Sequence, residues 1–297
     1  MSESFWDPTS CTQCPRQCRG DRTQGKGRCR MPWEPMLARA ALHHWEEPPL
    51  SGTRGTGTVF FSGCSLGCLF CQNDSISQKD FGKVVDRKRL REIFEALIAA
   101  GAHNIDLVNP THYAHVVKDV LEEPLPVPVV WNSGGYDRVE TLQALEGKIA
   151  IYLPDYKYPD AQGAARYSGA EDYPAVARAA IQEMVRQTGP YVIGEDGIME
   201  RGVIIRHLLL PGRLAQAKEV MDWVVETFPP HTVLFSLMSQ YIPWGRAAED
   251  PQLSRRLRKS EVRAAQAYME NLGLDGFSQE ESAAKAEYIP DFDLTGL

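Results

Sequence analysis

Three cysteines in one short segment are the residues of this chain best suited to do chemistry. Cys64, Cys68 and Cys71 follow the spacing C-x3-C-x2-C. Cysteine thiolates bind iron, and three of them can hold three irons of a four-iron cube while the fourth iron has no protein ligand. Clusters that only carry electrons usually take four cysteines, so this spacing indicates a cluster whose open iron binds a substrate or cosubstrate. We therefore expect these cysteines to be both metal ligands and catalytic residues.

A zinc site is the main alternative for this segment. The apolar residues 58–61 predict a strand that leads into the loop, and Gly63 and Gly67 allow the loop to turn tightly around a bound group. Zinc takes four ligands, or three and a water, commonly from two C-x2-C pairs. The nearest upstream histidines are His43 and His44. The pattern favours the cluster over zinc and over buried structural cysteines.

The other four of the seven cysteines form a second set near the N-terminus: Cys11, Cys14, Cys18 and Cys29. Their close spacing and glycine-rich turn favour metal binding over disulfides. A zinc site would stabilise a module of about thirty residues that is too small to fold alone, and a second [4Fe-4S] cluster would also add an electron-transfer station. The spacing matches neither a zinc ribbon nor a ferredoxin, so both metals stay open, with a slight preference for zinc or a structural role.

Composition predicts a globular enzyme without membrane or nucleic-acid partners. Of the 297 residues, 43% are apolar and 24% are charged, which suits one domain or one domain with a small appendage. No stretch approaches 18 consecutive apolar residues, and the N-terminus lacks the layout of a signal peptide, so we expect a cytoplasmic protein. The net charge of -7 argues against a phosphate backbone as the main partner.

Apolar strand-like segments alternate with helical patterns along most of the chain. This order is typical of a parallel sheet with right-handed crossovers. Six strands fit a partial (β/α)6 barrel, whereas a closed eight-stranded barrel would need two more units. A small hairpin is predicted at 189–202. The predicted strands cover 57–62, 104–108, 126–131, 149–153, 202–210 and 232–237, and the predicted helices cover 86–100, 112–122, 137–146, 171–188, 213–228 and 259–272.

The chain divides into two parts in this prediction. Residues 1–50 form the cysteine-rich module and a connector, and residues 51–297 form the partial barrel with a C-terminal helix. The proline and glycine content of residues 31–57 predicts a connector that lies on the main domain.

Polar residues follow five of the predicted strands at their carboxyl ends, where ligands bind in such sheets. A single polar residue after a strand is usually a turn or a helix cap, but five such groups in phase indicate a site. The groups are Asn109, Thr111 and His112; Asn132 and Ser133; Asp155 and Lys157; Arg206 and His207; and Ser239 and Gln240.

The cysteine loop, in FFSGCSLGCLFCQN, and the runs LHHWEEPPLSG, YLPDYKY, IIRHLLLPG and LMSQYIP carry a resemblance over nearly the whole chain. The chain resembles radical S-adenosylmethionine (SAM) proteins of the pyruvate formate-lyase activating enzyme family, particularly the branch with an N-terminal four-cysteine motif. This resemblance implies a partial (β/α)6 barrel with the cluster loop after the first strand. It also implies that SAM chelates the open iron through its amino and carboxylate groups.

The resemblance implies roles for residues around SAM. Cys64, Cys68 and Cys71 would ligate the catalytic [4Fe-4S] cluster, and Asn132, Ser133 and Asp155 would lie around the SAM carboxylate and a nearby monovalent cation. Lys157 and Arg206 would be SAM-facing cations, since a carboxylate in a partly dry site needs positive partners. The alternative is a structural ion pair of Asp155 with Lys157, because residues i and i+2 of a strand share a face. Phe70 is expected to pack against the cluster or adenine, although a plain core aromatic would look identical.

One segment departs from the family pattern. Many members carry Gly-Gly-Glu after the second strand to hold the SAM amino group, and this chain has Asn109-Pro110-Thr111-His112 there. Asn109 or Thr111 could replace that contact, and His112 could serve as a hydrogen-bond donor. Thr111 could equally cap the helix that follows.

The implied chemistry begins when a flavodoxin or ferredoxin reduces the cluster by one electron and SAM is cleaved. The resulting 5'-deoxyadenosyl radical then abstracts hydrogen from the substrate. Our first hypothesis for the substrate is a glycine of a partner protein, as in glycyl-radical activases. The alternatives are modification of another peptide or a small molecule, and a non-enzymatic iron-sulfur electron carrier. For His43, His44, Glu46 and Glu47, solvated or structural placements are favoured over lining the substrate side.

Overall fold

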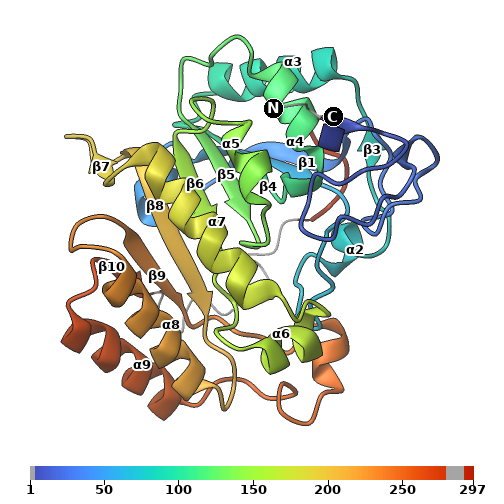
Figure 1. Cartoon of the computed structure of the whole chain (residues 1–297). Coiled ribbons are helices and arrows are strands. Elements are labelled where there is room, and N and C mark those ends of the chain that lie inside the picture. The colour runs from blue at the N-terminus through green and yellow to red at the C-terminus, as the bar shows by residue number, and fades with distance from the viewer. Residues whose placement is uncertain (1–3, 279–290) are drawn as a thin grey trace.

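The computed structural model describes residues 4–278 and 291–297 (Figure 1). Its centre is a sheet with the strand order β10-β9-β8-β6-β5-β4-β2-β1-β3, and β7 pairs with β8. The six predicted strands pair in parallel and in chain order, so the expected α/β fold with a parallel sheet is confirmed. They are β2 (Thr56–Phe61), β4 (Ile105–Val108), β5 (Val129–Ser133), β6 (Ile151–Pro154), β8 (Met199–Leu208) and β9 (Leu234–Met238).

The predicted connector at 31–57 contains a strand, which the sequence analysis did not expect. β1 (Met36–His43) pairs antiparallel with β2 over most of its length. Its sequence MLARAALH is rich in alanine and leucine, which favour helices, and lacks β-branched residues, so only the pairing and the burial of its side chains decide its state. The division of the chain at residue 50 stays a prediction.

Three shorter strands complete the sheet. β3 (Lys83–Val84) pairs antiparallel with β1, and β10 (Gly276–Ser278) pairs in parallel with β9. β7 (Val192–Ile193) pairs antiparallel with β8, which confirms the hairpin predicted at 189–202.

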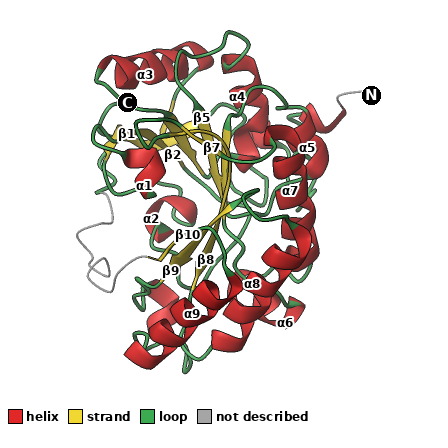
Figure 2. Ribbon diagram, turned by 90° about the vertical axis from the view of Figure 1, so that its left-hand side faces the viewer, coloured by secondary structure: helices red, strands yellow, loops and turns green. Residues whose placement is uncertain are grey.

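All six predicted helices form, most of them shorter at one or both ends. Figure 2 shows α4, α5, α7 and α8 on one side of the sheet and the short α1 and α2 on the other. None of the described helices combines the length and the apolar character that crossing a bilayer requires. The six are α3 (Arg87–Ala99), α4 (Ala114–Val120), α5 (Val139–Gln143), α7 (Tyr173–Thr188), α8 (Leu214–Thr227) and α9 (Lys259–Leu272); the short ones are α1 (Pro48–Ser51), α2 (Asp74–Ser77), α6 (Ala161–Ser168), and the 3-10 turns η1 (Ser4–Trp6), η2 (Arg22–Gln24), η3 (Thr111–Tyr113) and η4 (Gly245–Ala248).

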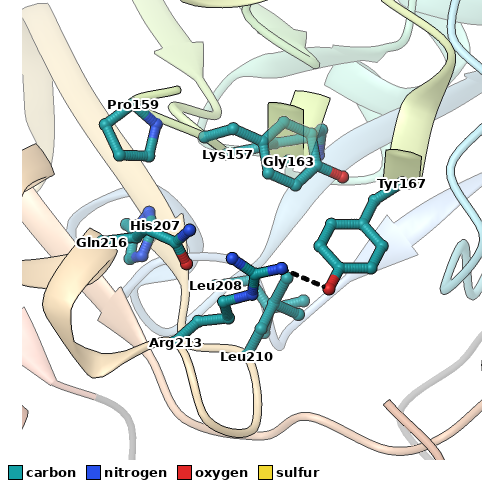
Figure 3. Close-up of a pocket in the computed structure, with 10 residues that line it drawn as sticks. Lys157, Pro159, Gly163, Tyr167, His207, Leu208, Leu210, Arg213 and Gln216 are labelled. Atoms are coloured by element: carbon teal, nitrogen blue, oxygen red, sulfur yellow. Dashed lines mark hydrogen bonds between the residues drawn. The ribbon is translucent and has the colours of Figure 1, made fainter. Parts of the chain in front are cut away.

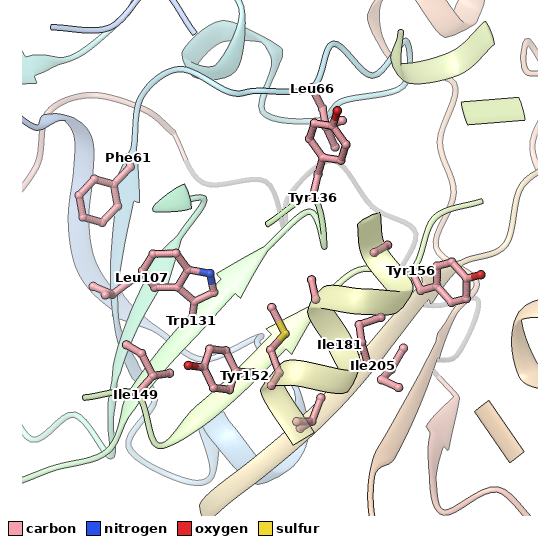
Figure 4. Close-up of a cluster of buried hydrophobic side chains, with 14 of the residues drawn as sticks. Phe61, Leu66, Leu107, Trp131, Tyr136, Ile149, Tyr152, Tyr156, Ile181 and Ile205 are labelled. Atoms are coloured by element: carbon pink, nitrogen blue, oxygen red, sulfur yellow. The ribbon is translucent and has the colours of Figure 1, made fainter. Parts of the chain in front are cut away.

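The main core lies between the sheet and the side of the molecule that carries α7 (Figure 4). Leu107, Trp131, Tyr152 and Ile205 point from four parallel strands toward Ile181 of α7 and its neighbours. Because side chains alternate along a strand, the intervening residues face the other side of the sheet.

A second, smaller core covers the other face of the sheet. Leu50 of α1 packs there with Val130, Ile151 and Ile204. Full burial of a leucine contributes roughly 1.5–3 kcal/mol, which holds the β1–β2 connection against the sheet. The residues just before α1 are therefore placed over the middle strands.

Candidate functional site

The three loop cysteines lie directly after β2, and each thiol contacts a different part of the fold. The Cys64 thiol lies 3.6 Å from Asn109 Oδ1, and the Leu66 N–H donates to its sulfur at 3.4 Å. Cys68 Sγ lies 2.9 Å from Ser168 Oγ at the end of α6. Cys71 Sγ lies 3.4 Å from Ser77 Oγ of α2, so the loop is fixed from several elements at once.

Burial and mutual repulsion keep the Cys64 and Cys71 thiols protonated in the protein alone. Burial raises the pKa of Cys64 to about 12, and the charges of Cys68 and Cys71 oppose its ionisation further. Burial likewise raises the pKa of Cys71 to about 11, with the charge of Cys68 adding to the effect. Lys157 favours both thiolates but brings only one positive charge. Three neighbouring thiolates need more positive charge than this, which a bound iron cluster would supply.

A single metal ion and a cluster place different demands on the ligands. Within residues 4–278 and 291–297, no group of three His, Cys, Asp or Glu side chains has an arrangement that could hold a metal ion. In a cluster, each cysteine binds a different iron.

The start of the loop needs two unusual backbone conformations. Gly63 has φ +81°, and a Cβ there would lie 2.2 Å from Met31 Cγ, so the position requires glycine. Asn109, which follows β4, has φ +59°, and its side-chain amide donates to the Gly63 carbonyl. The structure thus brings the predicted residue Asn109 to the cysteine loop.

Four other predicted residues form one chain of ion pairs and hydrogen bonds. Lys157 Nζ lies 2.5 Å from Asp155 Oδ2, and Arg206 Nε donates to Asp155 Oδ1 at 2.9 Å. Arg206 Nη2 donates to Asn132 Oδ1 at 2.7 Å. Although burial opposes it, Arg206 and Lys157 lower the pKa of Asp155. The structural ion pair of Asp155 with Lys157, the alternative from the sequence, is therefore present, and it does not exclude contact with a ligand.

Three acidic residues, Glu46, Glu47 and Asp106, extend this chain of interactions. Arg206 Nη1 lies 3.1 Å from Glu46 Oε1, and Ser236 Oγ donates to Glu47 Oε1 at 2.9 Å. Asp106 accepts a 3.4 Å hydrogen bond from Asn132. Of the solvated and structural placements expected for Glu46 and Glu47, the structure shows the structural one, because only 14% of the Glu46 side chain is exposed and Glu47 is buried. The sequence could have indicated Asp106, since a carboxylate within an apolar strand needs a buried partner.

Two of these carboxyl groups are incompletely paired. Glu47 Oε2 and Asp106 Oδ1 are buried and have no hydrogen-bond partner among the described residues. Burial raises the pKa of Glu47 to about 7, and the nearby Glu46 adds to the shift. Burial also raises the pKa of Asp106 well above its usual range. The centre of the sheet therefore holds an excess of acidic groups.

Thr111 and Ser133 both bind Asp137, which the sequence analysis did not single out. Thr111 Oγ1 donates to Asp137 Oδ1 at 2.7 Å, and Ser133 Oγ donates to Asp137 Oδ2 at 2.5 Å. Trp131 Nε1 lies 3.3 Å from the same carboxylate. Thr111 makes no helix-capping hydrogen bond, so the capping alternative is wrong. Asp137 instead ties together the loops that follow β4 and β5.

His112 and Phe70 have mainly packing roles in the protein alone. His112 Nε2 lies 2.7 Å from the Ser62 carbonyl, and burial lowers the pKa of His112 to about 3, so the ring is neutral. Phe70 makes edge-to-face contacts with Tyr158 and Tyr241. Its contact with a cluster or adenine stays a prediction.

A pocket opens beside Lys157, at the carboxyl ends of β6 and β8 (Figure 3). Arg213 reaches across it and donates to the Tyr167 hydroxyl at 2.6 Å. His207 Nδ1 contacts the Tyr156 carbonyl at 2.7 Å, and burial lowers the pKa of His207 to about 4. The cationic groups of this pocket are therefore Lys157 and Arg213, while His207 is neutral.

The N-terminal cysteines lie close to one another and beside the cysteine loop. Burial raises the pKa of Cys14 to about 12, and the charges of Cys29, Cys11 and Cys18 contribute. The Gln13 amide donates to Cys11 Sγ at 3.4 Å, and the Arg28 N–H donates to Cys18 Sγ at 3.4 Å. Such N–H donors suit metal-bound thiolates.

Arg16 connects this module to the cysteine loop. Its guanidinium donates to the Ser65 carbonyl at 2.8 Å and to the Gly169 carbonyl at 2.7 Å. The two cysteine sets are therefore joined through one side chain.

Comparisons with known proteins agree with this geometry. A family model described as a 4Fe-4S single cluster domain matches residues 51–152, which include the cysteine loop. The uncharacterized protein MJ0674 of Methanocaldococcus jannaschii is 29% identical over 276 residues, which cover 90% of this chain and 76% of that protein.

Two solved structures match this chain at low sequence identity. A radical SAM methyltransferase from Sphaerobacter thermophilus matches with a TM-score of 0.51 and 15% identity over 75% of this chain and 66% of that one. SuiB of Streptococcus suis, bound to the precursor peptide SuiA, matches with a TM-score of 0.49 and 13% identity over 73% of this chain and 47% of that one. The chain thus spans less than two thirds of these structures, and its fold is that of the radical SAM methyltransferase.

Proposed function

We propose that this protein is a radical SAM enzyme. In this proposal Cys64, Cys68 and Cys71 hold a [4Fe-4S] cluster whose open iron binds SAM. The bound cluster and SAM supply one-electron reductive cleavage and a 5'-deoxyadenosyl radical that abstracts hydrogen.

The observation that carries the proposal is the arrangement of the three cysteines. They are half-buried thiols in one loop directly after β2, and their mutual repulsion raises the pKa of Cys64 and of Cys71. The 4Fe-4S family match over this loop and the fold shared with a radical SAM methyltransferase support the same assignment.

The remaining predicted residues would bind and orient SAM. Lys157 lies close enough to Cys64 and Cys71 to favour their thiolates, and we assign it and Arg206 to the SAM carboxylate. Asp155 holds both cations in place through its two oxygens. Asn132 orients Arg206, and Asn109 supports the loop backbone. Thr111 and Ser133 would act through Asp137, which both already bind.

For the substrate, we propose a glycine in a partner protein. The support is the sequence resemblance to glycyl-radical activating enzymes. A flavodoxin or ferredoxin would be the reductant. The seven cysteines are all free thiols, which is in keeping with a cytoplasmic location.

The decisive test is anaerobic reconstitution followed by SAM and dithionite. We expect 5'-deoxyadenosine by mass spectrometry, and its loss in Cys64→Ala, Cys68→Ala and Cys71→Ala. Ser65→Ala, in the same loop, is the matched control and should keep the activity. Substantial turnover in any of the three cysteine variants would refute the ligand assignment.

The substrate hypothesis needs a separate test. Co-purified partners should be incubated with the reduced enzyme and SAM, and glycyl radicals sought by electron paramagnetic resonance. If deoxyadenosine forms but no partner acquires a radical, modification of another peptide or a small molecule takes precedence. If a reducible cluster never cleaves SAM, with or without those partners, the electron-carrier alternative takes precedence.

A further inference from the structure

The N-terminal cysteine module has a charge opposite to that of the whole chain. Six basic residues and one acidic residue lie between Cys11 and Arg30, although the chain carries a net charge of -7. The basic residues are Arg16, Arg19, Arg22, Lys26, Arg28 and Arg30. A positive region on an acidic protein can steer a negatively charged partner to one place.

Only some of these basic residues are buried or bind other groups of the protein with their side chains. Arg22 is buried, and Arg16 binds carbonyls of the loop and of α6. Arg30 pairs with Asp80 at 2.8 Å. Arg19, Lys26 and Arg28 are exposed, and none of them forms an ion pair with another described residue. Their charges are therefore available to a partner.

The available charges lie where the two cysteine sets reach the surface. Arg19 follows the exposed Cys18, and the Arg28 backbone binds the Cys18 sulfur. Arg28 Nη2 lies 3.8 Å from the place of a Cβ on Gly67, in the catalytic loop. Arg246, also exposed, donates to the Gly67 carbonyl at 2.9 Å. We call Arg19, Lys26, Arg28 and Arg246 the basic face; in Figure 1 the N-terminal module lies beside α2, which follows that loop.

We propose that the basic face docks an acidic protein that carries a low-potential electron. This inference rests on the proposed function, because reductive SAM cleavage needs one electron from outside. The reduced donor loses one electron, and the cluster held by Cys64, Cys68 and Cys71 gains it. Charge complementarity over the loop would raise the rate of encounter and fix the donor close to the cysteines.

The test compares two triple variants with equal loss of charge. Arg19→Gln, Lys26→Gln and Arg28→Gln are combined in one variant. Lys88→Gln, Arg89→Gln and Arg263→Gln, on the exposed surfaces of α3 and α9, form the control. A purified acidic flavodoxin is the probe. Its affinity for the reconstituted protein is measured by fluorescence titration, and cluster reduction by stopped-flow absorbance, both at several salt concentrations.

We expect association of the basic-face variant to be roughly tenfold slower at low salt and nearly independent of salt, because the steering charges are gone. The control should behave like the wild type. Equal association of wild type and basic-face variant, or an equal loss in the control, would overturn the proposal. Tighter binding of a labelled oligonucleotide than of flavodoxin, lost in the same variant, would overturn it in favour of a nucleic-acid site.

Dithionite separates this inference from the proposed function. With that small reductant, wild type and basic-face variant should form equal amounts of 5'-deoxyadenosine and contain equal iron. If the wild type forms none, with or without co-purified partners, although its cluster is reduced, the proposed function fails. The fluorescence titration still decides whether the basic face binds the acidic probe.

Discussion

At the scale of single residues, the site is defined by charges that the interior only partly balances. Glu46, Glu47, Asp106 and Asp155 meet two cations, Lys157 and Arg206, on one face of the sheet. Unpaired buried carboxylates are costly, so some of these groups take up protons. The raised pKa values of Glu47 and Asp106 reflect this cost.

This imbalance predicts a pH-dependent stability at Glu47. Its pKa lies at about 7 in the folded protein against 4.5 for an ordinary glutamate, so the folded state binds more protons between these values. The free energy of unfolding therefore falls as the pH rises from about 4.5 to about 7. We expect Glu47→Gln to be more stable than the wild type above pH 7, on the order of 1–3 kcal/mol, and equal to it near pH 4.5.

Urea unfolding at a series of pH values measures the effect of Glu47→Gln. Glu92→Gln on the exposed side of α3 serves as the control. Identical pH profiles for wild type and Glu47→Gln would show that the Glu47 carboxyl is not perturbed.

Two substitutions at Asn109 distinguish the effect of its side-chain hydrogen bond from the effect of its backbone conformation. Both Asn109→Gly and Asn109→Ala remove the hydrogen bond to the Gly63 carbonyl, and we expect both to bind less iron after reconstitution. At φ +59° alanine is also strained, so Asn109→Ala should be less stable than Asn109→Gly by about 1 kcal/mol. Iron analysis and urea unfolding measure the two effects, and equal stability of the variants would contradict the strain argument.

At the scale of elements, the turns after the strands position the site more tightly than the strands themselves. Gly134 and Gly135 follow β5, and Tyr173 from α7 donates its hydroxyl to the carbonyls of Gly134 and Asp155. This packing leaves almost no room between the β5 turn and the end of β6.

The neighbouring glycines predict opposite outcomes for the same substitution. A Cβ on Gly135 would lie 2.0 Å from the Asp155 carbonyl oxygen, and φ is +72° there. A Cβ on Gly134 would meet two flexible side chains, Leu66 Cδ1 at 3.1 Å and Lys157 Cε at 3.6 Å. We expect Gly135→Ala to lose roughly 1–3 kcal/mol or more and Gly134→Ala to stay near the wild type. Thermal unfolding measures both, and a stable Gly135→Ala would be the contrary result.

At the scale of the whole molecule, the N-terminal module is attached to the site region rather than to a remote surface. Arg16 binds the cysteine loop, and Arg138, just before α5, donates to the Thr12 carbonyl at 2.7 Å. The Thr141 hydroxyl donates to the Gln13 carbonyl at 2.6 Å. Loss of structure in the module should therefore disturb the cysteine loop.

Substitution of the N-terminal cysteines tests whether they hold a second metal. We expect Cys11→Ala or Cys14→Ala to lower the yield of folded protein first, because the module is too small to fold without a metal. Metal analysis of the wild type should then find about four irons, with zinc or with no second metal. About eight irons, and variants that fold normally but lack a second paramagnetic signal, would contradict the preference for zinc or a structural role.

The sequence by itself determined the features that depend on local pattern. The spacing of Cys64, Cys68 and Cys71 indicated a cluster loop, and alternating apolar segments predicted the six parallel strands in their order along the chain. Such patterns are readable because one face of each element must be buried. The strand β1 was not predicted, because its alanine-rich sequence lacks the residues that favour strands.

Only the tertiary structure decided which side chains meet at the site. Arg206 and Glu46 are 160 residues apart in the sequence, and Ser236 and Glu47 are 189 residues apart. No local sequence pattern therefore predicts either contact. Asp137 likewise gathers Thr111 and Ser133 from two loops, although neither residue type specifies that partner. The physical reason is that buried polar groups must find partners, and the packing of α1 and the strand ends selects which partners are within reach.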